Sequence, residues 1–170
     1  SNILVNDQGV VKLLDFGIAK MLSGDAETQP TTFAPMTPEY AAPEQMDGRA
    51  ITTATDVYGL GVVLYELLIG ARPRRGDTTR ASDAVAADTT LQLPTPPRMI
   101  AELRRFLRGD IDNILRQSLA ADPQERYASA GDLASDLRRF LEGQPVQAHP
   151  PSGWYRTKKF VRRHTATVSV

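Results

Sequence analysis

The stretch that decides the fold is TTATDVYGLGVVLYELLIG, residues 52–70. From Val57 to Ile69 its residues are apolar almost without polar relief, which is the pattern of a helix buried on all sides. Two threonines and Asp56 near its start are residues that cap helices, and Gly70 is a typical helix stop. We therefore expect a helix here that forms the buried axis of a globular domain.

On the N-terminal side of this helix the sequence predicts a hairpin and a long loop. Two short apolar runs at 3–5 and 10–14 are separated by turn formers, which is typical of a small hairpin. Between residues 17 and 47 periodicity is lost. A loop of that length inside a compact domain is usually functional.

On the C-terminal side the pattern predicts mainly helices. We expect a short helix at 82–88, an irregular passage through 93–97, and amphipathic helices at 111–120 and 129–142. The last of these places its apolar residues on one face and its charged residues outside that face. The apolar set is Leu133, Leu137, Phe140 and Leu141, and the charged set is Asp132, Asp136, Arg138 and Arg139.

Composition restricts the class of protein. Hydrophobic residues make up 41% and charged residues 24% of the 170 residues, as in one globular domain. Twenty basic residues balance twenty acidic ones, so no overall field favours nucleic acid as a partner. Cysteine is absent and the only histidines are His149 and His164, so neither a disulfide framework nor a zinc or iron site is expected.

Asp15-Phe16-Gly17 directly follows a predicted strand. A carboxylate in that place can reach a metal ion while the glycine lets the chain turn away. An aspartate at a strand end is more often only a turn former. The tripeptide alone therefore leaves both interpretations open.

The motifs around this tripeptide favour the metal site. S-N-I-L-V at 1–5 and V-K-L-L-D-F-G-I-A-K at 11–20 are followed by T-P-E-Y-A-A-P-E-Q at 37–45, the apolar helix, and D-P-Q-E-R-Y at 122–127. In these motifs the chain resembles the eukaryotic-type protein serine/threonine kinases, from the end of the catalytic loop onward. The run 136–146 is most similar to that of bacterial membrane-anchored kinases. The resemblance implies an α+β, mainly α-helical fold: the C-terminal lobe of the protein kinase fold with a small N-terminal β-hairpin.

The resemblance also implies ATP and Mg²⁺ as cofactors. Asn2 matches the catalytic-loop asparagine and Asp15 the metal-binding aspartate, which together hold Mg²⁺ against the nucleotide phosphates. Hard Mg²⁺ prefers one or two oxygen side chains plus phosphate and water. Ser-Asn is also a common remnant of an expression tag, but Ile3-Leu4-Val5 continues the kinase pattern in register.

Residues 17–37 resemble the activation segment, whose order is switched by a phosphate that pairs with arginine. Among its hydroxyls we favour Thr31 or Thr32 as the acceptor. Thr37 resembles the threonine that lines the substrate site and marks serine/threonine specificity. Met36 stands where the family commonly has glycine, which puts the local turn in doubt.

Three further residues resemble structural positions of the family. Glu44 and Arg126 match the buried ion pair that ties the end of the activation segment to the lower helices. Asp56 matches the aspartate that caps the backbone of the catalytic loop. An ordinary helix N-cap is the alternative for Asp56, and the two roles are compatible.

The chain holds only part of the kinase machinery. It has no Gly-rich phosphate loop, no strand lysine and no catalytic-loop aspartate, and in the family spacing that aspartate falls before Ser1. We therefore expect the chain to be a fragment that shows no phosphoryl transfer alone. A pseudokinase or regulatory scaffold, or a truncated gene product without function, are the alternatives; intact Asn2 and Asp15 argue against the scaffold.

We expect two parts: residues 1–143 as a partial kinase domain and residues 144–170 as a proline-containing linker with a basic juxtamembrane segment. Trp154 and Tyr155 precede a run of five cations without acids, which is the pattern beside the cytoplasmic face of a membrane. A solvated basic tail is the alternative. The resemblance favours anchoring to a bacterial inner membrane through a helix after residue 170, with protein substrates bearing Ser or Thr as partners and no nucleic acid.

Overall fold

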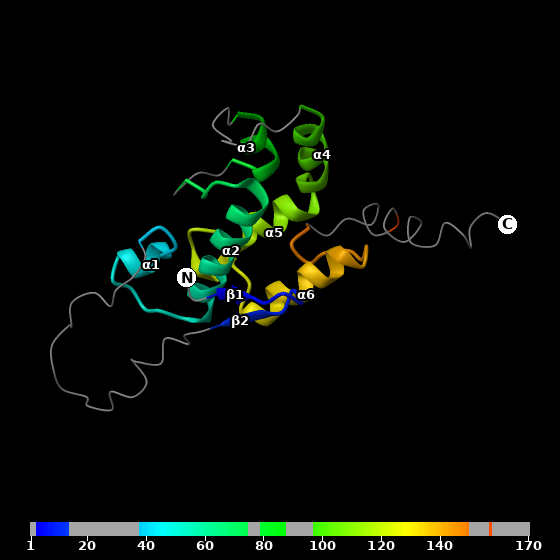
Figure 1. Cartoon of the computed structure of the whole chain (residues 1–170). Helices are drawn as coiled ribbons and strands as arrows, with labels where there is room; N and C mark the ends of the chain where they lie inside the picture. The colour runs from blue at the N-terminus through cyan, green and yellow to red at the C-terminus, as the bar shows by residue number, and fades with distance from the viewer. Residues whose placement is uncertain (1–2, 14–37, 75–78, 88–96, 150–156, 158–170) are drawn as a thin grey trace, which may run out of the picture. The chain divides into compact units, whose positions relative to one another are not determined.

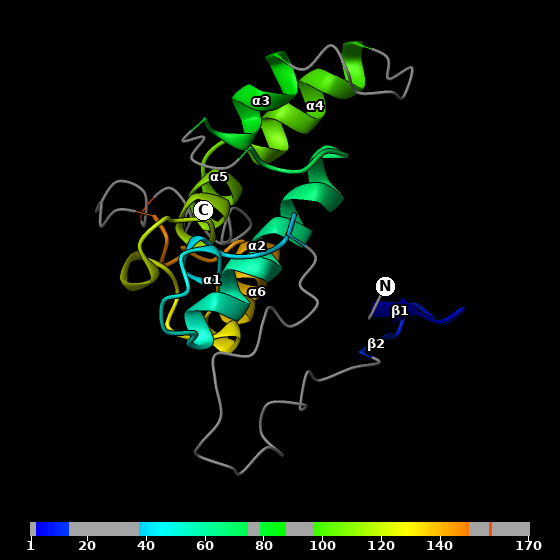
Figure 2. The same ribbon diagram turned by 90° about the vertical axis from the view of Figure 1, so that its left-hand side faces the viewer.

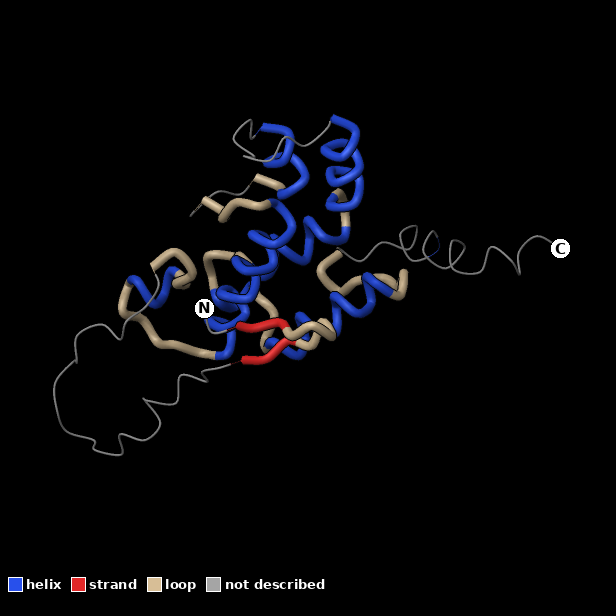
Figure 3. Tube along the Cα trace, viewed as in Figure 1, coloured by secondary structure: helices blue, strands red, loops and turns tan. Residues whose placement is uncertain are grey.

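A computed structural model of the chain describes residues 3–13, 38–74, 79–87, 97–149 and 157. It divides into two compact units, residues 1–35 and 36–170, and each is described by itself. The first contains a hairpin and the second contains the helices, as the secondary-structure colouring in Figure 3 shows. The predicted mainly α-helical α+β class is confirmed.

The N-terminal unit contains the predicted hairpin. Strand β1 (Ile3–Val5) pairs antiparallel with β2 (Val11–Leu13), with Val5 opposite Val11. The side-chain oxygen of Asn6 accepts hydrogen bonds from the backbone N–H groups of Gln8 (3.1 Å) and Val10 (2.8 Å). An asparagine that bonds the backbone ahead of it is a typical turn device, so the residues that predicted the turn also build it.

Helix α2 (Thr53–Ile69) occupies the stretch that decides the fold. It ends at Gly70, which has φ 79° and donates its N–H to the carbonyl of Glu66 at 2.8 Å. Glycine adopts this left-handed conformation without steric cost. The expectation that α2 is buried on all sides is wrong for the described part of the chain, because Leu60 is 41% and Leu67 is 78% exposed. The apolar run buries one face and leaves another uncovered.

Besides α2, the described part of this unit contains five α-helices and a short 3-10 helix (Figures 1 and 2). Helix α2 packs against α3, α5, α6 and η2, while α3 and α4 lie side by side. Their bounds are α1 (Pro43–Met46), α3 (Ala81–Ala87), α4 (Pro97–Leu107), α5 (Asp110–Ser118), η2 (Pro123–Glu125) and α6 (Ala130–Leu141).

The main hydrophobic core lies among α2, α3, α4, α5 and α6, and Ile114 and Leu107 are among its fully buried side chains. Helix α2 approaches α5 closely at Gly61, where a Cβ atom would lie 2.8 Å from the Cβ of Ser118. Only glycine allows this separation of the two helices. A second, smaller cluster contains Ala42, Tyr58 and Val62, and it adjoins the site described below.

Helix α4 is an element that the sequence analysis does not anticipate. Its first residue is Pro97, which fits the first turn of a helix because proline has no N–H to leave unpaired. Ile100, Leu103 and Leu107 recur at helical spacing and pack on the core. The prolines upstream obscured this pattern; residues 93–96 lie outside the described part of the chain.

The amphipathic helices α5 and α6 are confirmed. In α6, one residue assigned to the apolar face and one assigned to the charged face are misplaced. Leu141, assigned to the apolar face, is 81% exposed. Asp136, assigned outside that face, is 0% exposed. Its position three residues after buried Leu133 puts it on the same face of the helix, because residues i and i+3 are neighbours.

The packed part of the chain continues past Gly143. Val146 and Ala148 are buried and belong to the main core. Residues 144–148, which the sequence analysis assigns to a linker, thus cover the core beside α6.

Candidate functional site

The sequence-predicted site residues divide into two groups. Asn2, Asp15, Thr31, Thr32 and Thr37 lie outside the described residues. Glu44, Asp56 and Arg126 lie within them, on α1, on α2 and directly after η2. The described part of the site is therefore the region that follows Thr37 in the chain and the helices beneath it.

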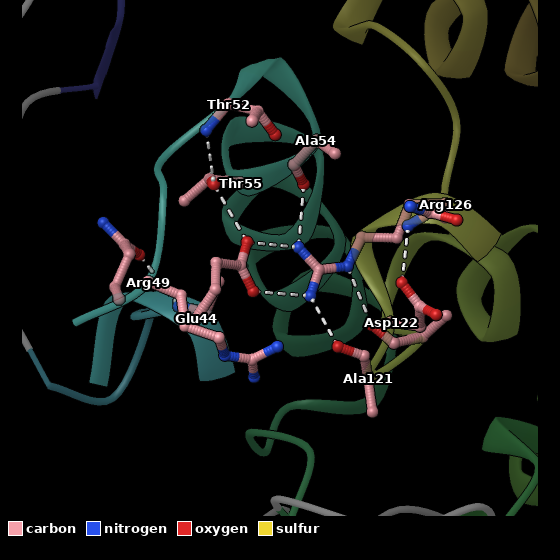
Figure 4. Close-up of polar contacts among 12 residues, drawn as sticks. Glu44, Arg49, Thr52, Ala54, Thr55, Ala121, Asp122 and Arg126 are labelled. Atoms are coloured by element: carbon pink, nitrogen blue, oxygen red, sulfur yellow. Dashed lines mark hydrogen bonds and ion pairs between the residues drawn. The ribbon is translucent and has the colours of Figure 1, made fainter. Parts of the chain in front are cut away.

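Glu44 and Arg126 form a buried ion pair (Figure 4). One guanidinium nitrogen lies 2.7 Å from Oε1 of Glu44 and the other lies 2.8 Å from Oε2, which is the two-point geometry of the strongest carboxylate contacts. The side chains are 0% exposed for Arg126 and 2% for Glu44. Thr55 on α2 donates its hydroxyl to Oε1 of Glu44 at 2.9 Å.

Arg126 uses all five of its N–H donors. Besides the two bonds to Glu44, it donates to the backbone carbonyls of Ala54 (3.0 Å), Ala120 (2.7 Å) and Ala121 (3.2 Å). Its guanidinium also lies 4.8 Å from the ring centroid of Tyr58. A fully paired arginine can stay charged in a buried place. This one side chain joins α1, α2 and the segment that follows α5.

The charge of Glu44 is held by its partners. The hydrogen bonds from Arg126 lower the pKa of the Glu44 carboxyl from 4.5 to about 2, assisted by Thr55, although burial alone would raise it. The carboxylate is therefore ionised throughout the physiological range. The contact is therefore a charge pair at neutral pH.

Asp56 has a different environment. It is exposed near the start of α2, and within the described residues no contact to its carboxylate is present. The N-cap position belongs to Thr52, whose backbone N–H is accepted by the Oγ1 of Thr55 at 3.1 Å. The ordinary N-cap alternative for Asp56 is thus wrong, and its role toward the catalytic loop stays a prediction.

A polar cluster anchors the residues just after Thr37. Tyr40 donates its hydroxyl to Glu66 on α2 at 2.6 Å. Arg72 lies 3.7 Å from Glu39 and 3.9 Å from Glu66, with its guanidinium 5.8 Å from the Tyr40 ring centroid. The hydrogen bond to Glu66 raises the pKa of the Tyr40 hydroxyl. The cluster ties the 38–40 turn to the second half of α2.

Comparison with protein-family models identifies the family that contains these contacts. The model of the protein kinase domain matches residues 1–136. The chain belongs to this family. The resemblance read from the sequence motifs is thereby confirmed, and by family the chain is classified with the protein serine/threonine kinases.

Curated bacterial kinases are similar over most of this kinase chain. Serine/threonine-protein kinase PknB of Mycobacterium tuberculosis (strain ATCC 25618 / H37Rv) is 37% identical over 150 residues, which cover 87% of the chain and 23% of the relative. The protein of the same name from Mycobacterium leprae (strain TN) is 34% identical over 148 residues, with the same coverage. The probable serine/threonine-protein kinase PknB of Bifidobacterium longum (strain NCC 2705) is 36% identical over 149 residues, covering 86% of the chain and 21% of the relative. The chain thus spans about a quarter of the length of these relatives.

The sequence analysis did not predict that two carboxylates of the kinase fold are buried. Asp112 on α5 accepts the backbone N–H of Ser82 at 2.9 Å and its hydroxyl at 2.7 Å, which joins α5 to the start of α3. Asp136 on α6 accepts the hydroxyl of Tyr127 at 2.8 Å. Each lies three residues from a buried leucine of its own helix, and that spacing is the signal that could have identified both.

Neither a metal cluster nor a membrane helix occurs among the described residues. No group of three or more metal-binding side chains comes together there. No helix in the described ranges is long and apolar enough to cross a bilayer.

Proposed function

We propose that the chain is the substrate-side lobe of a protein serine/threonine kinase that transfers the γ-phosphoryl group of ATP to Ser or Thr hydroxyls of proteins. The observation that carries the proposal is the match of the kinase domain model to residues 1–136, together with the buried Glu44–Arg126 pair. Phosphoryl transfer depends on positioning and on electrostatic stabilisation more than on covalent chemistry. The lobe's task is to hold the substrate segment and the metal ligands in place.

Asn2 and Asp15 are the proposed ligands of Mg²⁺. An amide oxygen and a carboxylate are a donor set that fits a hard cation which keeps water and phosphate oxygens as its other ligands. The bound ion would neutralise charge on the phosphate oxygens during transfer. Asp15 would supply the negative charge at the end of the β2 strand, and Asn2 would supply a neutral ligand before β1.

The proposed activation segment ends where the described contacts begin. Thr31 or Thr32 would accept a regulatory phosphate, and Thr37 would line the substrate site. The polar cluster at Tyr40 supports the role proposed for Thr37, because it fixes the residues directly after Thr37 to α2. Glu44 and Arg126 would hold the end of the segment, and Asp56 would orient the catalytic loop.

A chimera tests the proposal. Residues 1–149 of this chain replace the matching region of the M. tuberculosis kinase, which then supplies the Gly-rich loop, strand lysine and catalytic aspartate. We expect Mg²⁺-dependent transfer of labelled phosphate from ATP to a Ser/Thr peptide. The 170-residue chain alone should show no transfer above a blank.

Matched variants separate chemistry from folding. Asp15→Asn should abolish transfer in the chimera while leaving its unfolding midpoint unchanged, since the substitution preserves shape. Arg105→Gln, at an exposed position of α4, should leave transfer intact. A folded chimera that binds ATP but transfers nothing would favour the pseudokinase alternative.

We also propose that residues 154–164 lie against a bacterial inner membrane on its cytoplasmic side, with a spanning helix beyond residue 170. The basic residues attract the anionic leaflet, and Trp154 and Tyr155 suit its interface. The 170-residue chain should bind vesicles with anionic lipid and should not bind neutral vesicles. Binding that persists when the five cations of 156–163 are changed to Gln would contradict the proposal.

A further inference from the structure

A cavity of about 630 Å³, lined in part by Pro43 and Tyr58, has no part in the proposed transfer. Tyr65, Leu115 and Leu119 are also among the residues that line it. This volume lies within the range of sites that enclose a small ligand, and it can hold one large side chain. The walls offer mainly apolar and aromatic surface to an occupant.

The cavity wall is fixed by the buried pair. Tyr58 contributes to the lining and also carries Arg126 on its ring. Ala120 and Ala121 line the cavity, and their carbonyls accept hydrogen bonds from Arg126. Arg126 therefore ties three of the lining residues together, which favours a preorganised wall.

Cations dominate the rim. Arg74, Arg80 and Arg116 all line the cavity and are exposed, and within the described residues no hydrogen bond or ion pair engages their guanidinium groups. Two acids also line it. Glu125 is exposed, and Asp112 is buried with both oxygens occupied by Ser82. The three arginines outnumber the two acids, so the net charge of the lining is positive. The N–H groups that remain available to an occupant are those of the arginines.

We propose that this cavity is a docking site for an acidic protein segment that carries one apolar side chain. The apolar side chain enters between Tyr58 and Leu115, and the flanking carboxylates pair with the three arginines. Arginine suits this role because its planar donors match a carboxylate at two points. The aromatic and leucine walls favour a protein side chain over a bare inorganic anion.

The binding test needs no ATP and no catalysis, so its result is independent of the proposed kinase activity. The 170-residue chain is titrated by calorimetry with the peptide acetyl-Glu-Glu-Leu-Glu-Glu-amide. We expect binding that weakens as salt rises, because the rim charges are solvated. Replacing the four glutamates by glutamine, or the leucine by alanine, should each weaken binding.

Variants of the rim locate the site. The triple variant Arg74→Gln, Arg80→Gln, Arg116→Gln should bind the peptide about tenfold more weakly, as expected for three exposed charge pairs. Ala121→Trp, at an exposed position of the wall, should obstruct the leucine and weaken binding without disturbing the fold.

A charge-matched control keeps the proposal open to refutation. The triple variant Arg105→Gln, Arg108→Gln, Arg138→Gln changes three exposed arginines of α4, the residue after it, and α6, and it should bind like the parent chain. Equal loss in both triple variants, or no binding at all, would overturn the proposal. A single-stranded oligonucleotide of equal charge that binds as tightly, and with the same dependence on the rim arginines, would assign the cavity to phosphate instead of protein.

Discussion

Glu44 and Asp136 are both buried carboxylates of the helical unit, yet the molecule compensates their charges in different ways. Glu44 faces the guanidinium of Arg126 and has a second donor in Thr55. Asp136 faces neutral donors: the hydroxyl of Tyr127 at 2.8 Å, the N–H of Gln147 at 2.6 Å and the N–H of Ala148 at 3.0 Å. The first is a charge pair between α1 and the segment after η2, and the second mainly anchors the backbone of residues 147 and 148.

The two arrangements are supplied by neighbouring residues. Arg126 has an extended backbone, with φ −80° and ψ 173°, and successive side chains of an extended chain point to opposite sides. Arg126 therefore reaches Glu44 while Tyr127 reaches Asp136. The segment after η2 thus connects α1 with α6. The burial of Glu44 thus depends on a partner charge, whereas the burial of Asp136 depends on the placement of backbone donors.

Removing the cation should have the largest effect. Arg126→Met retains much of the side chain's length and apolar surface but leaves Glu44 buried without its counter-charge. We expect a loss of about 3 to 5 kcal/mol in the free energy of unfolding, measured by urea denaturation. Arg105→Met, at an exposed site, should stay within about 0.5 kcal/mol of the parent chain. A cost below about 1 kcal/mol for Arg126→Met would mean that the pair does not hold the lobe together.

The charge pair should also give the lobe an acid-sensitive component of stability. The folded pKa of Glu44, about 2, lies below the ordinary 4.5, so its contribution is present above pH 4.5 and is lost as pH falls toward 2. The lowering corresponds to about 3 kcal/mol. Glu44→Gln cannot titrate, so its urea stability should vary less than that of the parent chain between pH 5 and 2.5. Parallel curves for the two proteins over this window would contradict the assignment.

The sequence was sufficient for the features that depend on local pattern. The hairpin at Asn6 and the stop of α2 at Gly70 were predictable because each rests on the conformational preference of a single residue. The Glu44–Arg126 contact could be predicted only from the family resemblance. The two residues are far apart in the chain, and no periodicity relates them.

The features that were missed depend on tertiary context. Leu67 looks like core in the sequence, but its exposure is decided by what lies opposite that face of α2, which local pattern does not contain. Asp136 was read as solvent-facing because it is charged, although its helical position is that of a core residue. Its burial is possible only because Tyr127, Gln147 and Ala148 bring donors from outside the helix.

The backbone anchor should respond less strongly than the charge pair. Asp136→Asn keeps the shape but replaces one acceptor oxygen with a donor group, so that at least one of its three donors loses its partner. We expect a loss of about 1 to 3 kcal/mol in the free energy of unfolding. Amide hydrogen exchange should accelerate at Gln147 and Ala148 before it changes in α2. Asp132→Asn, an exposed change on the same helix, should leave both amides protected; unchanged exchange in Asp136→Asn would show that the carboxylate does not hold the segment.

The smallest effect at neutral pH should come from Tyr127→Phe, which removes one neutral donor and leaves Asp136 with two. We expect a cost of about 1 kcal/mol at pH 7. Burial, and then the hydrogen bond to Asp136, raise the pKa of the Tyr127 hydroxyl, so its contribution is present below pH 10 and is lost as pH rises further. The difference between the parent chain and Tyr127→Phe should therefore shrink above pH 10, whereas Glu44→Gln should keep a constant offset there. Urea midpoints of Tyr127→Phe and the parent chain that fell in parallel from pH 9 to 11 would show that Tyr127 does not make the anchor sensitive to alkali. The Glu44 site and the Asp136 site could then not be distinguished by sensitivity to acid in the first and to alkali in the second.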